Sequence, residues 1–293
     1  MLEHSYADVN RIKLHYVHAG KGELIMFLHG FPEFWYMWKN QLVEFGKDFL
    51  AVAPDMRGYN LSSRPQEVSQ YKARILMEDV RQLAQHLGHE KFTLVAHDWG
   101  GAVAWTFAMF YSQFVRRLII INAPHPATFE RELRNNPEQR KASSYMLMFR
   151  APQAEATLIA NNYEWLRKLA FGDLIKKGIM KKEDLDEYIN AWSQPGALTG
   201  GLNYYRAASV EALENPEEAA KKPAAGELLP KILVPTLVIW GEKDTALLTG
   251  CIDGLDKYIP DLRIKRIPDA SHWVVEERSD LVNQYMRDFI KET

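Results

Sequence analysis

The sequence predicts an α/β fold in which a mostly parallel central sheet is flanked by helices and carries an inserted helical cap. Three observations predict it. Short apolar runs bounded by turn residues alternate with helical patterns through the first half of the 293-residue chain. A segment with only helical periodicity follows, and further apolar runs and a helix end the chain. A chain of this length can form one α/β unit with an insertion.

The expected strands are short and apolar along their whole length, which is typical of parallel strands that helices cover on both faces. Helical patterns at residues 77–87 and 102–111 lie between them, so right-handed crossovers are expected. Residues 6–9 and 12–18 are expected to form an antiparallel hairpin at the sheet edge, and a last helix at 279–290 to cover one sheet face. The other strands are expected at residues 24–28, 49–53, 92–96, 118–121, 236–240 and 263–267.

The helical part of the sequence divides the expected core in two. Residues 1–124 and 228–293 are expected to form the α/β core, and residues 125–227 the helical cap and connector. The cap segment carries many aromatic and methionine residues. Its last part, residues 214–227, is rich in Glu, Ala, Lys and Pro and is expected to be a solvated helix and connector without a chemical role.

Composition restricts the classes of partner. A formal net charge of −2, from 36 basic and 38 acidic residues, gives no overall field that would attract nucleic acid or an anionic membrane. A small, largely uncharged substrate fits this balance better. Cys251 is the single cysteine, and residues 1–10 lack a basic flank followed by an apolar run, so we expect a cytoplasmic protein. No apolar stretch reaches the roughly 20 residues of a membrane span.

The segment 92–102 combines a buried strand, a tight turn and a helix start, which is the context of a nucleophile elbow. Asp98 occupies the nucleophile position. The close backbone packing of such a turn requires small residues, which Ala96, Gly100 and Gly101 supply. The turn alone leaves an alternative open, in which Asp98 only caps the following helix.

The loop after the first central strand, residues 28–35, is expected to aim a backbone N–H into the site. Phe31 would donate to an oxyanion together with the N–H of Trp99. Pro32 fixes the turn, and the sequence leaves the cis or trans state of its peptide bond open. An ordinary surface turn would be more polar than this aromatic loop.

Two residues near the end of the chain complete a candidate triad. Asp244 follows one late strand and His272 follows the next, so the order is Asp98, Asp244, His272. This is the nucleophile, acid, histidine order of α/β-hydrolases. Asp269 is a rival orienting acid, although three residues before His272 it is expected to shape the loop. His97 is expected to be structural because it points to the far side of its strand.

Together these segments make the chain resemble the epoxide hydrolase branch of the α/β-hydrolase superfamily, from about residue 25 to the C-terminus. The resemblance rests on segments 29–35, 55–59, 96–101 and 202–206. The loop that begins at Asn60 departs from the pattern, since relatives often carry Gly or Asp there, but no catalytic role depends on it.

The resemblance implies that two cap tyrosines, Tyr145 and Tyr205, hold the epoxide oxygen, with Tyr204 as a core or wall residue. Without it, cap tyrosines would be interpreted as packing residues. It also implies an aspartate nucleophile that opens the epoxide to a covalent ester, which water activated by His272 then hydrolyses to a vicinal diol. Asp244 would orient His272. No cofactor and no metal is required, and the pair His86 and His89 lacks further ligands nearby.

The pocket is expected to be apolar and aromatic, which favours lipophilic or aryl epoxides. Each candidate wall residue is also an ordinary core candidate, and about half are expected to touch substrate. Besides Phe31 and Trp99, the candidates are Trp35, Trp38, Met146, Trp192, Leu247 and Trp273.

Two alternatives from different classes stay open. A dehalogenase would use the same aspartate, histidine and acid, but its halide leaving group needs N–H donors and no proton, whereas Tyr145 and Tyr205 suit an alkoxide. A non-catalytic binding protein of this fold is the second alternative, since fold does not establish activity. A serine esterase or lipase is less favoured than either alternative, because no serine occupies the elbow. The sequence leaves a monomer and a homodimer equally open.

Overall fold

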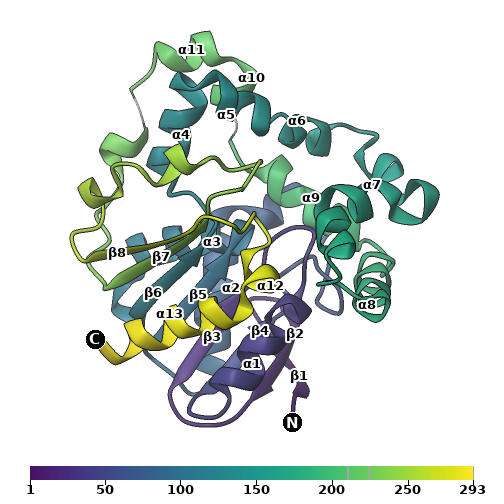
Figure 1. Cartoon of the computed structure of the whole chain (residues 1–293), viewed down its shortest axis with the longest axis vertical. Coiled ribbons are helices and arrows are strands. Elements are labelled where there is room, and N and C mark those ends of the chain that lie inside the picture. The colour runs from purple at the N-terminus through teal and green to yellow at the C-terminus, as the bar shows by residue number, and fades with distance from the viewer. Residues whose placement is uncertain (210, 224, 293) are drawn as a thin grey trace.

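The computed structural model describes residues 1–209, 211–223 and 225–292. Its centre is an eight-stranded sheet in the order β1-β2-β4-β3-β5-β6-β7-β8 (Figure 1). β1 pairs with β2 and β2 with β4 in antiparallel fashion, and all later neighbours are parallel. The strands are β1 (Glu3–Val9), β2 (Ile12–Ala19), β3 (Leu24–Leu28), β4 (Leu50–Pro54), β5 (Phe92–His97), β6 (Val115–Ile121), β7 (Thr236–Gly241) and β8 (Leu262–Ile267).

The predicted sheet is confirmed, including the antiparallel hairpin at its edge. Most strand boundaries agree with the sequence prediction within one residue. β1 and β6 differ, since β1 begins at Glu3 and not at residue 6, and β6 begins at Val115 and not at residue 118. The first residues of β6 include Arg116 and Arg117, which are not fully buried and interrupt the apolar run from which that strand was predicted.

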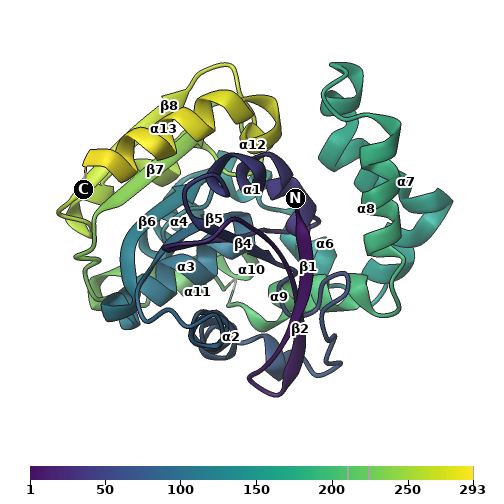
Figure 2. The same cartoon turned by 90° about the horizontal axis from the view of Figure 1, so that it is seen from below.

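Helices cover both faces of the sheet (Figure 2). α1 (Lys39–Phe45) and the final helix α13 (Ser279–Glu292) lie on one face, and α2 (Ala73–His86) and α3 (Asp98–Phe110) on the other. α12 (Val274–Glu277) precedes α13. α2 buries one side of its surface at Leu76, Met77, Val80, Leu83 and Ala84, a spacing that places these residues on one helical face.

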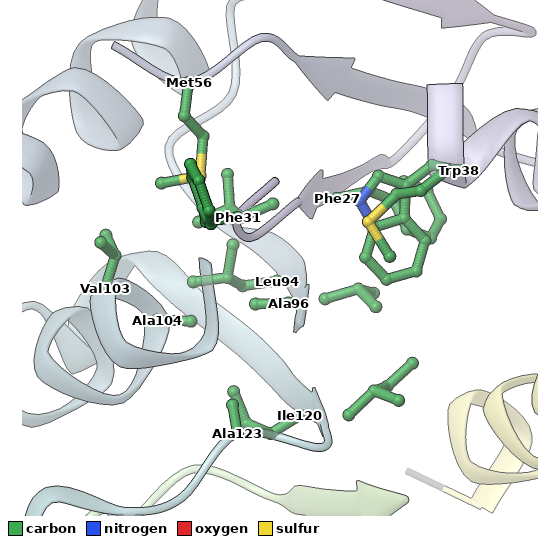
Figure 3. Packing of buried hydrophobic residues seen from close by; sticks show 14 of the residues in the cluster. Phe27, Phe31, Trp38, Met56, Leu94, Ala96, Val103, Ala104, Ile120 and Ala123 are labelled. Carbon is green, nitrogen blue, oxygen red and sulfur yellow. The ribbon is translucent and has the colours of Figure 1, made fainter. Parts of the chain in front are cut away.

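Aromatic packing joins the sheet to the first helix. The rings of Phe27 on β3 and Trp38 pack together (Figure 3), with centroids 5.3 Å apart. The ring centroids of Phe27 and Phe45 lie 6.0 Å apart. Trp38 belongs to the short 3₁₀ turn η1 (Trp35–Trp38) and is fully buried. This side chain therefore stabilises the core below the sheet's carboxyl edge.

The segment between β6 and β7 is helical in the described residues and lies beyond the carboxyl ends of the parallel strands (Figure 1). The division into core and cap at residues 124 and 228 stays a prediction. The helices are α4 (Pro126–Asn135), α5 (Pro137–Ala142), α6 (Tyr145–Arg150), α7 (Ala154–Lys176), α8 (Lys182–Trp192), α9 (Ala197–Ala207), α10 (Glu211–Glu214) and α11 (Pro216–Ala220). The short 3₁₀ turn η4 (Ala225–Leu228) belongs to the same segment, and further 3₁₀ turns are η2 (Val68–Tyr71), η3 (Ser112–Phe114), η5 (Thr249–Ile252) and η6 (Leu255–Lys257).

Hydrogen bonds fasten these helices to the loops at the carboxyl edge of the sheet. Trp192 on α8 donates from Nε1 to the carbonyl of Pro32 at 2.6 Å. Tyr204 on α9 donates to the carbonyl of Arg57 at 2.9 Å. These bonds fix α9, and with it the neighbouring Tyr205, relative to the strand ends. Across the described ranges, no helix has both the length and the apolar character needed to cross a membrane.

Candidate active site

Asp98 stands at the turn between β5 and α3 and adopts a left-handed backbone conformation, with φ 49°. This strained geometry is the one expected of a nucleophile elbow. The turn lies against the neighbouring strand end, because a Cβ on Gly100 would come within 2.5 Å of the carbonyl oxygens of Leu28 and His29. Only glycine fits there. The Asp98 side chain is 11% exposed.

The two oxygens of Asp98 have different surroundings. Oδ1 accepts a hydrogen bond of 2.8 Å from the N–H of Phe31. Oδ2 lies 3.8 Å from Nε2 of His272. The N–H of Trp99 belongs to the first turn of α3, where backbone N–H groups have no partner within the helix. The structure thus brings Phe31 to Asp98 as expected and places the Trp99 amide next to it in the chain.

His272 and Asp244 form a short contact at the ends of neighbouring strands. Nδ1 of His272 donates to Oδ2 of Asp244 at 2.7 Å, which leaves Nε2 directed to Asp98. Asp269, the rival acid, instead pairs with Arg278 at 2.7 Å and is 62% exposed. Asp269 is therefore exposed at the surface and does not orient His272.

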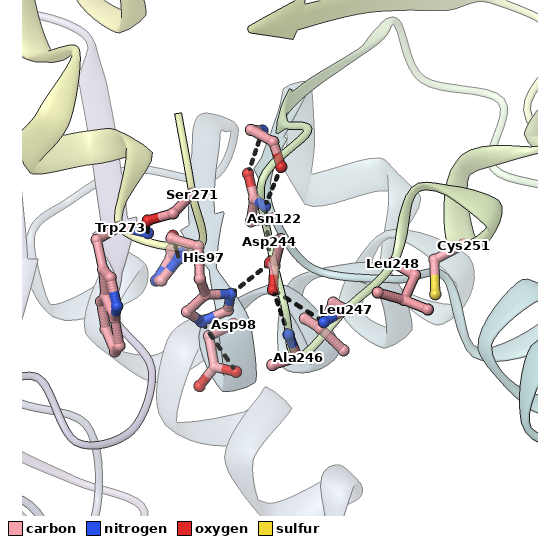
Figure 4. A network of polar contacts seen from close by, with 12 residues as sticks. His97, Asp98, Asn122, Asp244, Ala246, Leu247, Leu248, Cys251, Ser271 and Trp273 are labelled. Carbon is pink, nitrogen blue, oxygen red and sulfur yellow. Dashed lines mark hydrogen bonds and ion pairs between the residues drawn. The ribbon is translucent and has the colours of Figure 1, made fainter. Parts of the chain in front are cut away.

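Asp244 is held by several donors (Figure 4). Its Oδ1 accepts from the N–H groups of Ala246 and Leu247 at 2.8 and 2.9 Å. Its Oδ2 also accepts from Nδ2 of Asn122 at 2.8 Å, and Asn122 follows β6. Burial acts to raise the pKa of Asp244, but the charge of His272 and these hydrogen bonds outweigh it and hold the pKa below its usual value. Asp244 is therefore a fixed negative charge.

The pKa of His272 is raised to about 9. Burial opposes this shift, but the charge of Asp244 and the hydrogen bond to it, together with the charge of Asp98, stabilise the imidazolium. His272 is thus protonated near neutral pH. Loss of the Asp98 charge would remove part of this stabilisation and make His272 a better base.

Tyr145 and Tyr205 come together above Asp98 from α6 and α9. Their ring centroids lie 6.2 Å apart, and the ring of Tyr205 packs edge-on against Trp99 with centroids 4.9 Å apart. Burial, and the nearby charge of Asp98, raise the pKa values of both tyrosines well above the usual value. Both hydroxyls are therefore protonated near neutral pH and can donate hydrogen bonds.

A cavity of about 640 Å³ connects these groups. Asp98, Trp99, Tyr145 and Tyr205 all line it. Its other walls are mainly apolar and come from α3, α4, α6 and the loop after β7; they include Ala102, Val103, Phe129, Leu133, Met146 and Leu247. Four charged residues also line it: Glu130, Arg134, Glu211 and Lys222. A space of this size suits a drug-sized, mostly apolar ligand.

Four tryptophans expected in the pocket wall do not line this cavity. Trp35 and Trp38 are buried beneath the loop that carries Phe31. Trp192 packs against Phe171 and is hydrogen-bonded to Pro32. Trp273 packs edge-on against His272, with ring centroids 5.0 Å apart. These four tryptophans are core and support residues here, whereas Met146 and Leu247 do line the cavity.

The connector was expected to have no chemical role, but part of it contributes to the cavity wall. Ala219, Lys222 and Pro223 line the cavity because the connector folds back on α4. Residue 224, within the same segment, lies outside the described residues. The composition of the connector predicted that it is solvated and did not indicate that it folds back on α4.

Sequence reasoning also missed residues that support the site. Phe129 and Leu133 line the cavity from one face of α4. The two residues are four positions apart in the first helix after β6, which places both on one side of that helix. This spacing could have identified them from the sequence. His97 donates from Nε2 to the backbone carbonyl of His272 at 2.9 Å. It is structural as expected, but it supports the catalytic candidate directly.

Within the described residues, no three His, Cys, Asp or Glu side chains are arranged to hold a metal ion. The groups that are present can supply a carboxylate nucleophile, two hydroxyl donors, an oriented imidazole and backbone N–H groups. Such a set fits displacement at carbon followed by hydrolysis of an ester.

Comparison with known proteins gives one consistent result. The alpha/beta hydrolase fold family matches residues 23–279. Epoxide hydrolase 3 of Xenopus tropicalis is 36% identical over 304 aligned positions, which cover 99% of this chain and 78% of that protein. The crystal structure of a Bacillus megaterium epoxide hydrolase with an inhibitor is 39% identical, has a TM-score of 0.92 and covers 98% of this chain and 100% of that one. A variant of the Bacillus megaterium enzyme has been crystallised with its product, a naphthyloxy-propanediol.

Proposed function

The chain belongs to the alpha/beta hydrolase fold family, in its epoxide hydrolase branch, and from this premise we propose that it converts lipophilic or aryl epoxides to vicinal diols. The observation that supports this proposal most strongly is that Asp98, Tyr145 and Tyr205 line one cavity, while Nε2 of His272 lies 3.8 Å from Oδ2 of Asp98. A nucleophile, proton donors and a base thus meet at one point.

Ring opening is the first step of the proposed reaction. Oδ2 of Asp98 attacks an epoxide carbon in line with the carbon–oxygen bond that breaks, because Oδ1 is held by the Phe31 N–H. The bonding pair goes to the ring oxygen. Tyr145 or Tyr205 gives that oxygen a proton while the other hydroxyl donates a hydrogen bond to it. The product of this step is a hydroxyalkyl ester of Asp98.

Hydrolysis of the ester is the second step. His272, oriented by Asp244, takes a proton from water, and the hydroxide oxygen adds to the ester carbonyl. Negative charge develops on Oδ1, where the N–H groups of Phe31 and Trp99 stabilise it. The bond between the carbonyl carbon and the oxygen that leaves in the diol then breaks, and the protonated His272 gives its proton to that oxygen. The new carboxylic acid returns its proton to the tyrosinate left by the first step, which restores Asp98 and both tyrosine hydroxyls. An aspartyl ester can be cleaved in this way, whereas the ether formed by a serine cannot.

The proposed substrate class follows from the cavity wall. Apolar side chains from α3 and α4 dominate it beyond the catalytic groups, so a lipophilic or aryl substituent buries its surface there. The naphthyloxy-propanediol product belongs to the Bacillus megaterium relative and is in accord with this class.

The dehalogenase alternative shares the Asp98, Asp244 and His272 arrangement. A halide leaves without a proton and needs no hydroxyl, whereas the alkoxide of an opened epoxide does. The buried and protonated pair of Tyr145 and Tyr205 beside Asp98 supports the epoxide. A non-catalytic binding protein of this fold would not need a histidine that is oriented by an acid.

A direct test uses a small panel of epoxides and haloalkanoates, with separate detection of diol and halide. We expect diol from phenyl glycidyl ether and related epoxides and no halide release. In a single turnover with excess enzyme in water labelled with heavy oxygen, the label should enter Asp98 and not the first diol. Halide without diol, or label appearing directly in the diol, would contradict the proposal.

We also propose that the protein acts in the cytoplasm as a monomer or homodimer, without nucleic acid or membrane as partner. Support comes from its near-neutral net charge of −2 and from its single cysteine, Cys251, which is buried and free. Sedimentation of the purified protein decides between the two oligomeric states.

A further inference from the structure

Arg150 joins the two helices that carry Tyr145 and Tyr205. It is the last residue of α6, which begins at Tyr145, and α6 packs against α9. Its Nη1 donates to the backbone carbonyl of Tyr205 and, at 2.9 Å, to that of Ala208. Arg150 is not one of the described residues that line the cavity. This side chain thus connects both tyrosine helices without lining the space in which the substrate is expected to bind.

The carbonyl groups that Arg150 binds lie at the carboxyl end of α9. The last four carbonyls of an α-helix have no partner within the helix. α9 ends at Ala207, and the N–H of Ala208 bonds back to the carbonyl of Tyr204. The carbonyls of Tyr205 and Ala208 are therefore left for a donor from another element. A cation at this end of a helix is also favoured by the helix dipole, so an arginine suits the position.

Each of the two helices is also fastened separately to the core. On α9, the hydroxyl of Tyr204 donates to the carbonyl of Arg57, in the loop after β4. Just before α6, Gln139 donates from Nε2 to the carbonyl of Ala246, in the loop after β7, at 2.8 Å. The two helices thus depend on different loops of the core. Arg150 is a direct link between them.

The rings of Tyr145 and Tyr205 share one neighbour, which belongs to α6. The ring centroid of Phe149 lies 5.4 Å from that of Tyr145 and 4.9 Å from that of Tyr205. Phe149 is buried and directly precedes Arg150 in the chain. Packed side chains transmit displacements, so a shift of α6 relative to α9 would move the two tyrosine hydroxyls relative to each other.

We propose that Arg150 is a positioning residue for the ring-opening step, because it sets the separation of α6 and α9 at which Tyr145 and Tyr205 bond the same epoxide oxygen. This inference rests on the function proposed above. One hydroxyl gives the oxygen its proton and the other donates a hydrogen bond, so both must lie about 3 Å from a single atom. The base for ester hydrolysis is His272, so Arg150 acts on the first step and not on the second.

Arg150→Met tests this role, because it keeps the apolar stem of the side chain and removes the donors to both carbonyls. Rapid quench with phenyl glycidyl ether measures ring opening and ester hydrolysis separately. Arg150→Met should slow ring opening by about tenfold or more, since a misplacement of about 1 Å can cost about 10² in rate. Ester hydrolysis should stay within about twofold of the native rate.

Two matched controls separate the carbonyl bonds from other effects of the substitution. Glu214→Ala removes the ion-pair partner of Arg150, whose Oε1 lies 3.2 Å from Nε, and leaves the carbonyl bonds in place. Arg167→Met removes another arginine of the same helical segment, which donates to the carbonyl of Asn161 at 3.2 Å. Both controls should open the epoxide and hydrolyse the ester at native rates.

A double-mutant cycle tests whether Arg150 acts through the pair of hydroxyls. Where only one hydroxyl is present, the separation of the two helices no longer matters for the epoxide oxygen. Arg150→Met should therefore slow ring opening by less than about threefold when it is added to Tyr145→Phe, and likewise when it is added to Tyr205→Phe. A general loss of packing would instead multiply with either tyrosine change.

A measurement without substrate tests the link between the helices. Amide hydrogen exchange in peptides from residues 201–209, followed by mass spectrometry, should be about fivefold or more faster in Arg150→Met, because the end of α9 has lost its fastening. Glu214→Ala and Arg167→Met should exchange as the native protein does. If Arg150→Met does not fold, as judged by circular dichroism, Arg150→Gln gives the same comparison, because its shorter side chain cannot reach both carbonyls.

Three results would overturn the inference. The first is a folded Arg150→Met protein that opens the epoxide at the native rate or slows both steps equally. The second is a loss of rate that persists in full in the Tyr145→Phe and Tyr205→Phe backgrounds. The third is unchanged hydrogen exchange at the end of α9. If the protein forms no diol at all, the proposed function fails, whereas hydrogen exchange still decides whether Arg150 fastens α9 to α6.

Discussion

The Nε2 atom of His272 lies 3.8 Å from the Oδ2 atom of Asp98, although the two residues stand 174 positions apart in the chain. At this distance the groups attract each other as charges but do not form a normal hydrogen bond. Oδ1 of Asp98 is meanwhile held by the N–H of Phe31. One oxygen of the carboxylate is thus committed to the oxyanion position, and the other is free to form a bond to substrate.

Asp98→Asn should abolish turnover and leave the fold intact, because the amide retains the shape of the turn but is a poor nucleophile. Diol formation by freshly purified protein is the measurement, with circular dichroism as the folding control. Mass spectrometry must first exclude deamidation back to aspartate. Multiple turnovers at the native rate in such a sample would refute the nucleophile role.

His272→Gln should still open the epoxide but fail to release the diol, since the base acts only on the ester. Intact mass spectrometry should show protein plus one epoxide accumulating after substrate is added. Asp98→Asn/His272→Gln is the control and should form no adduct. Absence of adduct in the single variant, although it binds substrate, would contradict this division of the two steps.

Tyr145→Phe and Tyr205→Phe each remove one hydroxyl and leave the apolar wall in place. Each should slow ester formation by about tenfold or more, because general acid assistance is typically worth about 10² or above, and the double variant should be nearly inactive. Rapid quench measures ester formation in all three. Tyr204→Phe, whose hydroxyl bonds the Arg57 carbonyl, is a control for the loss of a cap hydroxyl elsewhere. An unchanged rate in a folded double variant would favour the dehalogenase.

The two chemical steps should respond differently to pH. His272 must be neutral to accept a proton from water, and its pKa of about 9 applies while Asp98 is charged. Ester formation removes that charge, so the pKa falls, and hydrolysis should accelerate as pH rises to a plateau reached below about pH 9. Ring opening needs protonated tyrosines, whose pKa values are raised, and should stay constant over this range. Rapid quench of both steps across pH tests this; hydrolysis that slows with rising pH would exclude His272 as base.

Asp79→Leu should strongly destabilise the fold. Arg57, nearly fully buried, donates from Nε and Nη2 to both oxygens of Asp79 at 2.7 Å. Removing the carboxylate leaves a buried cation without its partner, at a cost of about 3–5 kcal/mol in the free energy of unfolding. Arg57→Met/Asp79→Leu should recover much of that loss. Urea unfolding of the native protein and three variants checks both outcomes, and equal losses in the single and double variants would contradict them.

Much of the scaffold could be predicted from local sequence because its signals are local. Uninterrupted apolar runs predicted buried parallel strands, and a spacing of about 3.6 residues predicted α2 and α13. Where charged residues interrupted a run, as at Arg116 and Arg117 in β6, the strand was predicted too short. Its backbone pairing with β5 decides the true start, and pairing is not a local property.

Part of the candidate active site could also be predicted from the sequence, and part could not. The order of Asp98, Asp244 and His272 along the chain, each after a strand, was visible in the sequence, because parallel strands place their carboxyl ends at one edge. Which aromatic side chains enclose the cavity was not visible. Trp38 and Phe129 have similar apolar character, yet the first packs beneath the sheet edge and the second lines the cavity.

The sequence by itself determined where the catalytic candidates stand relative to the strands. It placed Asp98 in a tight turn that small residues permit, an acid and a histidine after later strands, and a helical segment between them. Only the tertiary structure decided which Asp orients His272 and that Tyr145 and Tyr205 line one cavity with Asp98. The physical reason is that turns and strands depend on neighbours in the chain. The protonation of a buried group and the wall of a cavity depend on side chains brought together from distant segments.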